Sequence, residues 1–194
     1  MQQPSQISAD EIYVATDIET DGPSPGQYSM LSLASVAFWL DKTIVGTFEK
    51  NLELLPGAKQ HPRNMEFWKS QPEAWTACRS NLVSPAVAMR EYAEWLKKLP
   101  AKPVMVAHPV GFDFTFVHWY LHEFTGDSPF FSAGLDMASY AMAVMRTPFT
   151  KSHKPYMPKT WTDATPPHTH KAIDDAMGHA MVFCNMVAAN RAMT

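Results

Sequence analysis

The chain has 194 residues, of which 46% are hydrophobic and 18% are charged, so its composition predicts one globular domain and excludes an intrinsically disordered protein. Its net charge of −3 argues at first against a nucleic-acid-binding protein, and its two cysteines exclude a disulfide framework. No apolar run approaches the roughly 20 residues that cross a bilayer, and no secretion signal is visible, so we expect a cytoplasmic protein.

The first half of the chain predicts a loose tail followed by three antiparallel strands. Residues 1–9 are polar and are expected to form a flexible tail, which leaves residues 10–194 as a single domain. Residues 12–16 form a short apolar run that ends at Asp17, as expected of a buried strand with polar side chains at its carboxyl end. Two further apolar runs, 30–40 and 43–50, follow after short turns, and short connections favour antiparallel pairing.

The second half alternates helical and strand patterns, which predicts an α/β fold with a mixed sheet. A fourth strand is expected at residues 104–107, running into a polar segment. Helices are expected at 65–69, 73–79, 84–99, 113–124, 136–145 and 171–191. In the last of these helices, the residues expected on the buried side are Ile173, Met177, Met181, Cys184 and Val187.

Residues 146–169 have no hydrophobic period, and they include five prolines. A loop of this length in a compact domain is usually functional or disordered, and we expect a mobile lid. The positive charge of the protein is concentrated here, because residues 146–171 carry five Lys and Arg side chains against Asp163 alone. A solvated loop with no partner is an equally good interpretation of that charge.

Three separated groups of ionisable residues suggest a common site. Asp17 and Glu19 are two residues apart on a predicted strand, so their side chains share one face. Asp113 follows the fourth strand, and His170 and Asp175 open the last helix. Carboxylates are the ligands that Mg²⁺ prefers, two such ions can catalyse cleavage of a phosphodiester, and a neutral imidazole can accept a proton from water. Together these residues predict a two-metal phosphodiesterase with a histidine base.

Each group taken alone has an ordinary explanation. Asp17 and Glu19 are compatible with a surface turn, and His108 with a satisfied buried histidine. Asp113 could cap its helix, and Asp174 and Asp175 could be acids placed favourably in a first helical turn. The hypothesis therefore depends on all the groups occurring together, in this order and on these elements.

In this combination the residues resemble the DnaQ-like, or DEDDh, 3′–5′ exonucleases. The first motif of that family is matched by residues 17–20 with Gly22, the second by residues 108–113, and the third, His-x-Ala-x-x-Asp-Ala, by residues 170–176. The resemblance covers residues 12–188. It implies a ribonuclease H-like mixed five-stranded sheet, with three antiparallel strands plus parallel strands, flanked by helices.

The resemblance also implies an activity and its cofactors. It implies hydrolysis of single-stranded DNA or RNA from the 3′ end to release 5′-mononucleotides, with two divalent ions, Mg²⁺ or Mn²⁺. Asp17, Glu19 and Asp175 would hold one ion, Asp17 and Asp113 would hold the other, and His170 would be the general base. Family spacing favours Asp175 and His170 over their neighbours Asp174 and His168. A homodimer is a further expectation from the resemblance.

Substrate contacts are expected at residues that flank the motifs. The backbone of Thr20, Asp21 and Gly22 matches the contact to the terminal 3′-hydroxyl. His108 belongs to the second motif, and the aromatic residues that could stack on bases include Phe112 and Trp161, the latter from the polar loop. Pro23 stands where many members have a Leu or Met wedge, so Tyr28 or Met30 is expected to replace it or the wedge is missing.

Two alternatives remain open from the sequence. One is a phosphodiesterase that acts on dinucleotides or short oligonucleotides, and the other is a non-catalytic nucleic-acid-binding module. A preference for DNA or RNA depends on the space available for a 2′-hydroxyl, which the sequence does not specify.

Overall fold

The computed structural model describes residues 10–162 and 171–193, so the tail expected at residues 1–9 lies outside the described residues. Within them, one five-stranded sheet has the order β3-β2-β1-β4-β5. Its strands are β1 (Glu11–Thr20), β2 (Met30–Phe38), β3 (Ile44–Asn51), β4 (Lys102–Ala107) and β5 (Leu135–Asp136). β1, β2 and β3 pair antiparallel, whereas β4 pairs parallel with both β1 and β5. The predicted mixed five-stranded sheet is confirmed.

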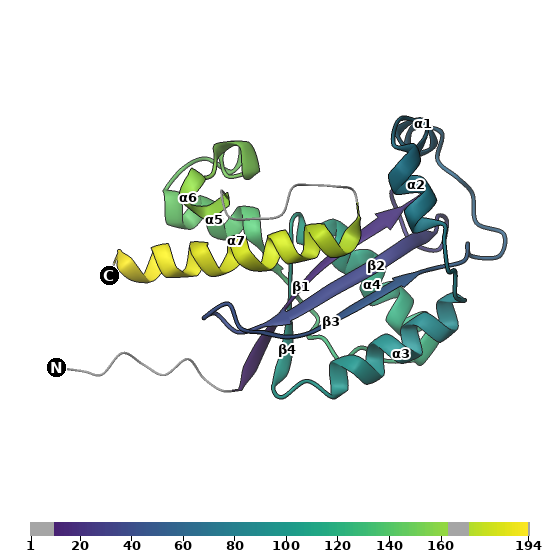
Figure 1. The fold of residues 1–194 in the computed structure, drawn as a ribbon, viewed down its shortest axis with the longest axis horizontal. Helices are drawn as coiled ribbons and strands as arrows, with labels where there is room; N and C mark the ends of the chain where they lie inside the picture. The colour runs from purple at the N-terminus through teal and green to yellow at the C-terminus, as the bar shows by residue number, and fades with distance from the viewer. Residues whose placement is uncertain (1–9, 163–170, 194) are drawn as a thin grey trace.

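Helices cover both faces of this sheet (Figure 1). One face packs against the helices that follow β3 and β4, and the other packs against the helices of the C-terminal third. The α-helices are α1 (Pro62–Ser70), α2 (Pro72–Cys78), α3 (Pro85–Lys97), α4 (Val110–Thr125), α5 (Met137–Met145), α6 (Lys159–Thr162) and α7 (Ala172–Ala192). The predicted helix boundaries agree within a few residues, because proline or capping side chains mark several of the starts.

α7 crosses β1 and β2 with its small residues against the sheet (Figure 1). Ala172, Ala176 and Ala180 are buried in the same cluster as Ala15 of β1 and Ala34 of β2. The predicted buried side was therefore partly wrong, since Ile173, Met177 and Met181 are only partly buried around this cluster, whereas Cys184 and Val187 are buried as expected. Side chains no larger than a methyl group let the helix backbone approach the strands closely, which brings the first turn of α7 over β1.

On the opposite face, α3 and α4 are tied to the strands by buried hydroxyl groups. The Ser35 hydroxyl lies 2.8 Å from the Thr16 hydroxyl and 2.7 Å from the Tyr92 hydroxyl of α3. The backbone N–H of Met30 donates to the Tyr120 hydroxyl of α4 at 2.7 Å. Because buried polar groups are costly when unpaired, these bonds fix the helices against the sheet as well as contributing to stability.

The segment from residue 146 to 162 is more ordered than its sequence predicts. It contains two short 3-10 helices, η1 (Phe149–Lys151) and η2 (Lys154–Tyr156), and then α6. Met157 and Trp161 are buried in the cluster beneath α7, and Asn185 of α7 donates a hydrogen bond to the carbonyl of Trp161 at 2.9 Å. The expectation of an irregular loop is thus wrong for these residues, because hydrophobic periodicity does not detect single buried side chains between prolines, whereas the expected mobility and lid role stay predictions. Residues 163–169 of that expected loop lie outside the described residues.

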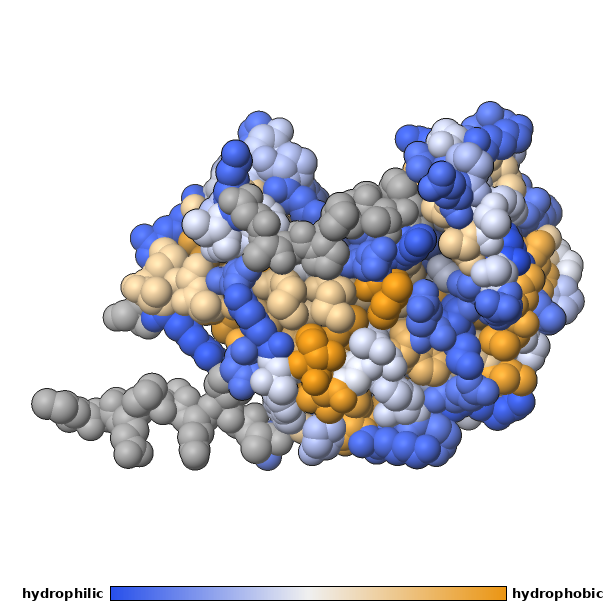
Figure 2. All heavy atoms as spheres, in the orientation of Figure 1, coloured by the Kyte–Doolittle hydropathy of each residue, from blue (hydrophilic) through white to orange (hydrophobic). Residues whose placement is uncertain are grey.

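Two further observations concern the surface. Figure 2 shows that the surface is hollowed between the α1–α2 segment and the α5–α6 segment, with hydrophilic residues on both sides of the hollow. Among the described helices, none is both long and apolar enough to cross a membrane.

We predict that Trp161→Ala destabilises the protein by about 3–5 kcal/mol, because it removes a large side chain from a packed core. Tyr156→Ala is the matched control, because Tyr156 lies in the same segment but is 50% exposed, and it should change stability by no more than about 0.5 kcal/mol. Urea unfolding of both variants in chelator measures the difference. Equal stabilities would show that Trp161 is not a core residue.

Candidate active site

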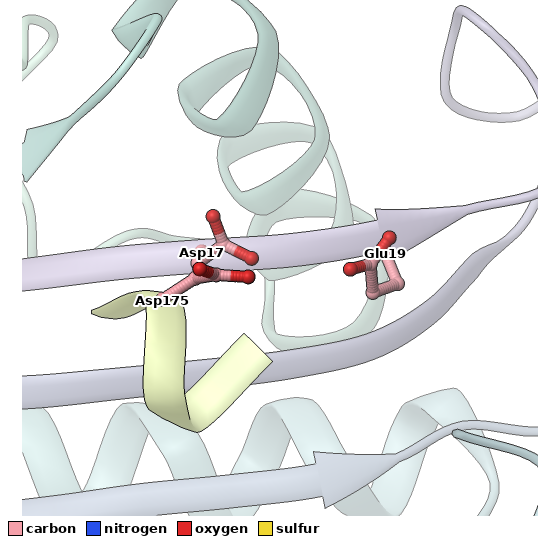
Figure 3. Close-up of side chains that lie close together, drawn as sticks. All are labelled: Asp17, Glu19 and Asp175. Carbon is pink, nitrogen blue, oxygen red and sulfur yellow. The ribbon is translucent and has the colours of Figure 1, made fainter. Parts of the chain in front are cut away.

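Three carboxylates meet where the first turn of α7 crosses β1. Asp17 and Glu19 are on the same face of β1, as their spacing predicts, and Asp175 is in the first turn of α7. One carboxylate oxygen from each of the three lies within 4.8 Å of the others. Figure 3 shows Asp175 reaching Asp17 from α7, with Glu19 further along β1. Residues that are more than 150 positions apart in the sequence therefore form one cluster.

Asp113 joins this cluster from the sheet edge next to β1. It lies in the first turn of α4, directly after β4, and it is only 5% exposed. Its Oδ1 accepts a hydrogen bond from the backbone N–H of Ile18 at 3.2 Å. Since Ile18 lies between Asp17 and Glu19, this bond holds the fourth carboxylate beside the other three.

The electrostatics of the cluster favour protons or cations over bare carboxylates. Burial raises the pKa of Glu19 to about 8, and the charges of Asp175 and Asp113 add to that effect. Burial also raises the pKa of Asp17 well above its usual value, with further contributions from Asp113, Glu19 and Asp175. Burial raises the pKa of Asp113 to about 7. A divalent cation would remove this penalty, because it offsets the mutual repulsion of the carboxylates.

The donor set also indicates which cation would fit. All the acidic ligands offer hard oxygen atoms, which suit Mg²⁺ or Mn²⁺ better than metals that prefer sulfur. The three clustered carboxylates leave further coordination positions for water or a substrate oxygen. The residues present therefore fit a divalent metal site of the kind that the sequence predicts.

One residue at this site was missed by the sequence analysis. His179 of α7 is buried, with its Nδ1 3.9 Å from Oδ1 of Asp17. A signal was available, because His179 lies four residues after Asp175 and therefore on the same side of the helix. A buried imidazole at this distance can restrict the orientation of the Asp17 carboxylate.

The residues expected near the terminal 3′-hydroxyl form a well-defined loop after β1. The backbone N–H of Ser29 donates to Asp21 Oδ1 at 2.6 Å, and the N–H of Asp21 donates to the carbonyl of Ser29 at 3.1 Å. The Thr20 hydroxyl donates to the carbonyl of Gly22 at 2.9 Å. Both side chains are buried and shape the loop. The N–H and carbonyl of Asp21 and the carbonyl of Thr20 also accept or donate hydrogen bonds within the protein, so a backbone contact to substrate at residues 20–22 stays a prediction.

The same loop distinguishes the two candidates for the wedge. A side chain at Gly22 would overlap the ring of Tyr28, which therefore lies directly on this glycine. Tyr28 is partly exposed, whereas Met30 is fully buried in the core. Tyr28 is thus the remaining candidate for the wedge, because it lies at the surface beside the first motif whereas the Met30 side chain is packed in the core.

The other predicted substrate residues are distributed differently. His108 and Phe112 are partly exposed between β4 and the first turn of α4, next to Asp113. Trp161 is 6% exposed and packs in the core cluster, which corrects the expectation that it lies in a polar loop and stacks on bases. His170, the predicted base, and His168 lie outside the described residues.

Comparisons with known proteins agree with this site. No protein-family profile matches the chain. The chain is 31% identical over 182 residues to the 3′-5′ DNA exonuclease Cap18 of Escherichia coli, covering 89% of this chain and 90% of that protein.

Two solved structures share the fold at low sequence identity. The nuclease domain of 3′hExo, a DEDDh family member bound to rAMP, superposes with a TM-score of 0.68 at 11% identity, over 93% of this chain and 94% of the other. Pop2p of S. pombe, in its Mg²⁺- and Mn²⁺-bound form, superposes with a TM-score of 0.60 at 12% identity, over 89% of this chain and 81% of the other.

We predict that the metal-free protein loses stability as the pH rises from about 4 to about 7, and that Asp113→Asn removes part of this loss. An unfolded aspartate ionises near pH 4, whereas the folded Asp113 holds its proton up to about pH 7. Between these pH values the native state binds more protons than the unfolded state, so the free energy of unfolding falls as the pH rises. The Asn variant keeps an oxygen that can accept from Ile18. Its melting temperature in chelator should match the wild type at pH 5 and exceed it by several degrees at pH 8.

A wild-type melting temperature that rises between pH 5 and pH 8 in chelator, or an Asn variant that gains nothing at pH 8, would contradict this electrostatic description. Adding MgCl₂ or MnCl₂ at pH 8 should stabilise the wild type more than Asp113→Asn, because a cation relieves the same repulsion.

Proposed function

The chain belongs to the DnaQ-like, or DEDDh, 3′–5′ exonucleases, and from this premise we propose that it hydrolyses single-stranded DNA from the 3′ end by a two-metal mechanism. The observation that carries this proposal is the convergence of four carboxylates from three separated segments on one strand edge. DNA is favoured over RNA because the curated relative that covers most of this chain is named as a DNA exonuclease. The products would be 5′-mononucleotides and a strand shortened by one residue.

The metal ligands would be Asp17, Glu19, Asp113 and Asp175. Asp17 would contribute to both ions, because it lies in the cluster with Glu19 and Asp175 and also interacts with the charge of Asp113. When bound, two divalent ions neutralise the phosphoryl oxygens, activate the attacking water and stabilise the leaving oxygen. The raised pKa values of these carboxyl groups support a site whose charge balance requires cations.

The protein residues would manage the proton and the position of the strand. His170, the residue directly before Lys171 in the sequence, would accept a proton from the attacking water. The water oxygen forms the new bond to phosphorus, the bond from phosphorus to O3′ breaks, and O3′ receives a proton to become the new terminal hydroxyl. The backbone of residues 20–22 would hold the terminal nucleotide, and Phe112 would support its base.

The two other functions compatible with the sequence are less well supported. The complete carboxylate cluster argues against a non-catalytic binding module, because a module that binds no cation gains nothing from bringing four mutually repelling carboxylates together. Nothing in the described residues closes the site against long strands, so a dinucleotide preference has no specific support. The homodimer expected from the resemblance stays a prediction.

We predict that Asp175→Asn abolishes exonuclease activity, whereas Asp174→Asn leaves it within a few-fold of the wild type. The two acids are adjacent, but only Asp175 belongs to the carboxylate cluster, so the pair separates loss of a metal ligand from loss of a nearby charge. The measurement is a gel time course on matched 5′-labelled single-stranded DNA and RNA, with MgCl₂, MnCl₂ or EDTA. A ladder that shortens from the 3′ end, faster on DNA and absent with EDTA, is the expected result.

Wild-type protein that left both 20-mers and 2-mers intact with either metal would refute the proposed function. Cleavage of 2-mers alone would establish the short-oligonucleotide phosphodiesterase instead. Activity retained in Asp175→Asn would refute the assignment of the metal ligands.

We predict that His170→Ala lowers kcat by at least about 100-fold with little change in KM, since a general base contributes about 10²–10⁴-fold to the rate. His168→Ala is the matched control and should retain nearly full activity. His179→Ala should instead raise the metal concentration needed for half-maximal rate, because His179 lies against Asp17. A His170→Ala variant with normal kcat and raised KM would reassign this residue to substrate binding.

A further inference from the structure

Three imidazole rings, those of His179, His108 and His153, form a row beside the carboxylate cluster that we call the imidazole wall. Lys154 directly follows His153 in the chain. His179, which approaches Asp17, has its ring centroid 6.2 Å from that of His108. The His108 ring in turn lies 5.4 Å from the His153 ring in an edge-on arrangement. Lys154 follows His153 and begins the short helix η2. The wall therefore leads from Asp17 to Lys154 through three histidines from different parts of the chain.

The wall is a fixed part of the fold. η1 and η2 enclose Ser152, which is fully buried and donates its hydroxyl to the carbonyl of Phe149 at 2.7 Å. The ring of Phe149 lies 5.0 Å from that of His153. Met157, directly after η2, is anchored in the core under α7. Lys154 is thus held from both sides along the chain, which limits where its ammonium group can reach.

Lys154 differs from five other lysines in what its ammonium group contacts. Lys50, Lys69 and Lys97 each form an ion pair with a glutamate, and Lys102 and Lys151 each lie over an aromatic ring. Lys154 is partly buried, and within residues 10–162 and 171–193 it forms no ion pair within 4.0 Å. Partial burial of an ammonium group without a direct partner costs free energy, so we expect such a group to bind a ligand.

The charge of Lys154 also acts on the imidazole wall. Burial lowers the pKa of His108, and Lys154 and then His153 lower it further. Among the described residues, the buried Nε2 of His108 also has no hydrogen-bond partner, which leaves a second polar group available on the same wall.

We propose that Lys154 is a catalytic residue whose ammonium group binds a non-bridging oxygen of the scissile phosphate. This inference rests on the proposed function. The scissile phosphate must lie against Asp17, and Lys154 is the cation that directly follows the imidazole wall leading from Asp17. Lysine acts on a phosphate as a compact point charge. The ammonium keeps its proton throughout, while the bond from phosphorus to O3′ breaks and the bond to the water oxygen forms.

The effect would be larger in the transition state than in the bound substrate. Charge on the non-bridging oxygens changes during transfer, and a fixed cation in a partly water-excluded site stabilises that change without reorganisation. The loss on removing Lys154 should therefore fall mainly on kcat. A lysine that merely reduced repulsion among the carboxylates would instead change metal affinity and the stability of the metal-free protein.

The test compares Lys154→Gln and Lys154→Arg with two matched controls from the same segment, Lys151→Gln and Lys159→Gln. Lys151 lies over Tyr156 and is exposed, and Lys159 is exposed at the start of α6. Each protein is assayed at saturating MnCl₂ on the p-nitrophenyl ester of thymidine 5′-monophosphate, which has only the scissile phosphate, and on 5′-labelled dT12. We expect Lys154→Gln to lower kcat by about 100-fold on both substrates, Lys154→Arg to recover much of it, and the controls to stay within about twofold.

Three results would overturn the inference. A Lys154→Gln variant that matches the controls on both substrates would show that Lys154 does not contact the reacting group. A loss of activity confined to dT12, together with a slope of log KM against log salt concentration that is smaller by about 0.7, would place Lys154 on an upstream phosphate. Recovery of the wild-type kcat when MnCl₂ is raised beyond the concentration that saturates the wild type would show that Lys154 acts through the carboxylates. Failure of the proposed function is distinguishable, because the wild type would then be inactive on both substrates.

Discussion

The mutual repulsion of four clustered carboxylates, two of them buried and two partly buried, is the constraint on which the rest of this structure depends. Asp17, Glu19, Asp113 and Asp175 are brought together although each would be more stable in water. Such an arrangement persists only where the surrounding fold is rigid enough to hold it and where a cation can offset the charge. The pKa values of the carboxyl groups are therefore raised, and in the metal-free protein these groups keep protons where metal ions would bind.

The fold provides that rigidity through contacts between distant segments. The strand β1 supplies two acids from adjacent positions of one face and lies in the centre of the sheet, paired with β2 and β4. The Ile18 N–H fixes Asp113 at the start of α4, and the alanine surface of α7 lets Asp175 approach β1. The loop after β1 is closed on itself by Asp21 and Ser29, so the backbone groups that we propose hold the terminal nucleotide are preorganised.

The segment from residue 146 to 162 then completes the site from the other side. Its buried side chains fix the segment against the core, and the segment places His153 in the imidazole wall with Lys154 next to it. The remaining lysines of the segment are exposed. This arrangement explains how a protein with a net charge of −3 can act on a polyanion. The negative charge is concentrated where cations would bind, so bound cations would offset its repulsion of a phosphate.

The sequence by itself determined the fold class, the order of the elements and the carboxylates of the site, because these depend on local patterns. Strand alternation places Asp17 and Glu19 on one face, and the spacing of the third motif separates Asp175 from Asp174. Only the tertiary structure showed that Trp161 and Met30 are buried and which groups surround His179 and Lys154. Burial and electrostatic environment arise from segments that are distant in the chain, so a tryptophan between prolines gives no local sign that α7 will cover it. The same holds for Lys154, because His108 and His179 of the neighbouring imidazole wall come from distant parts of the chain.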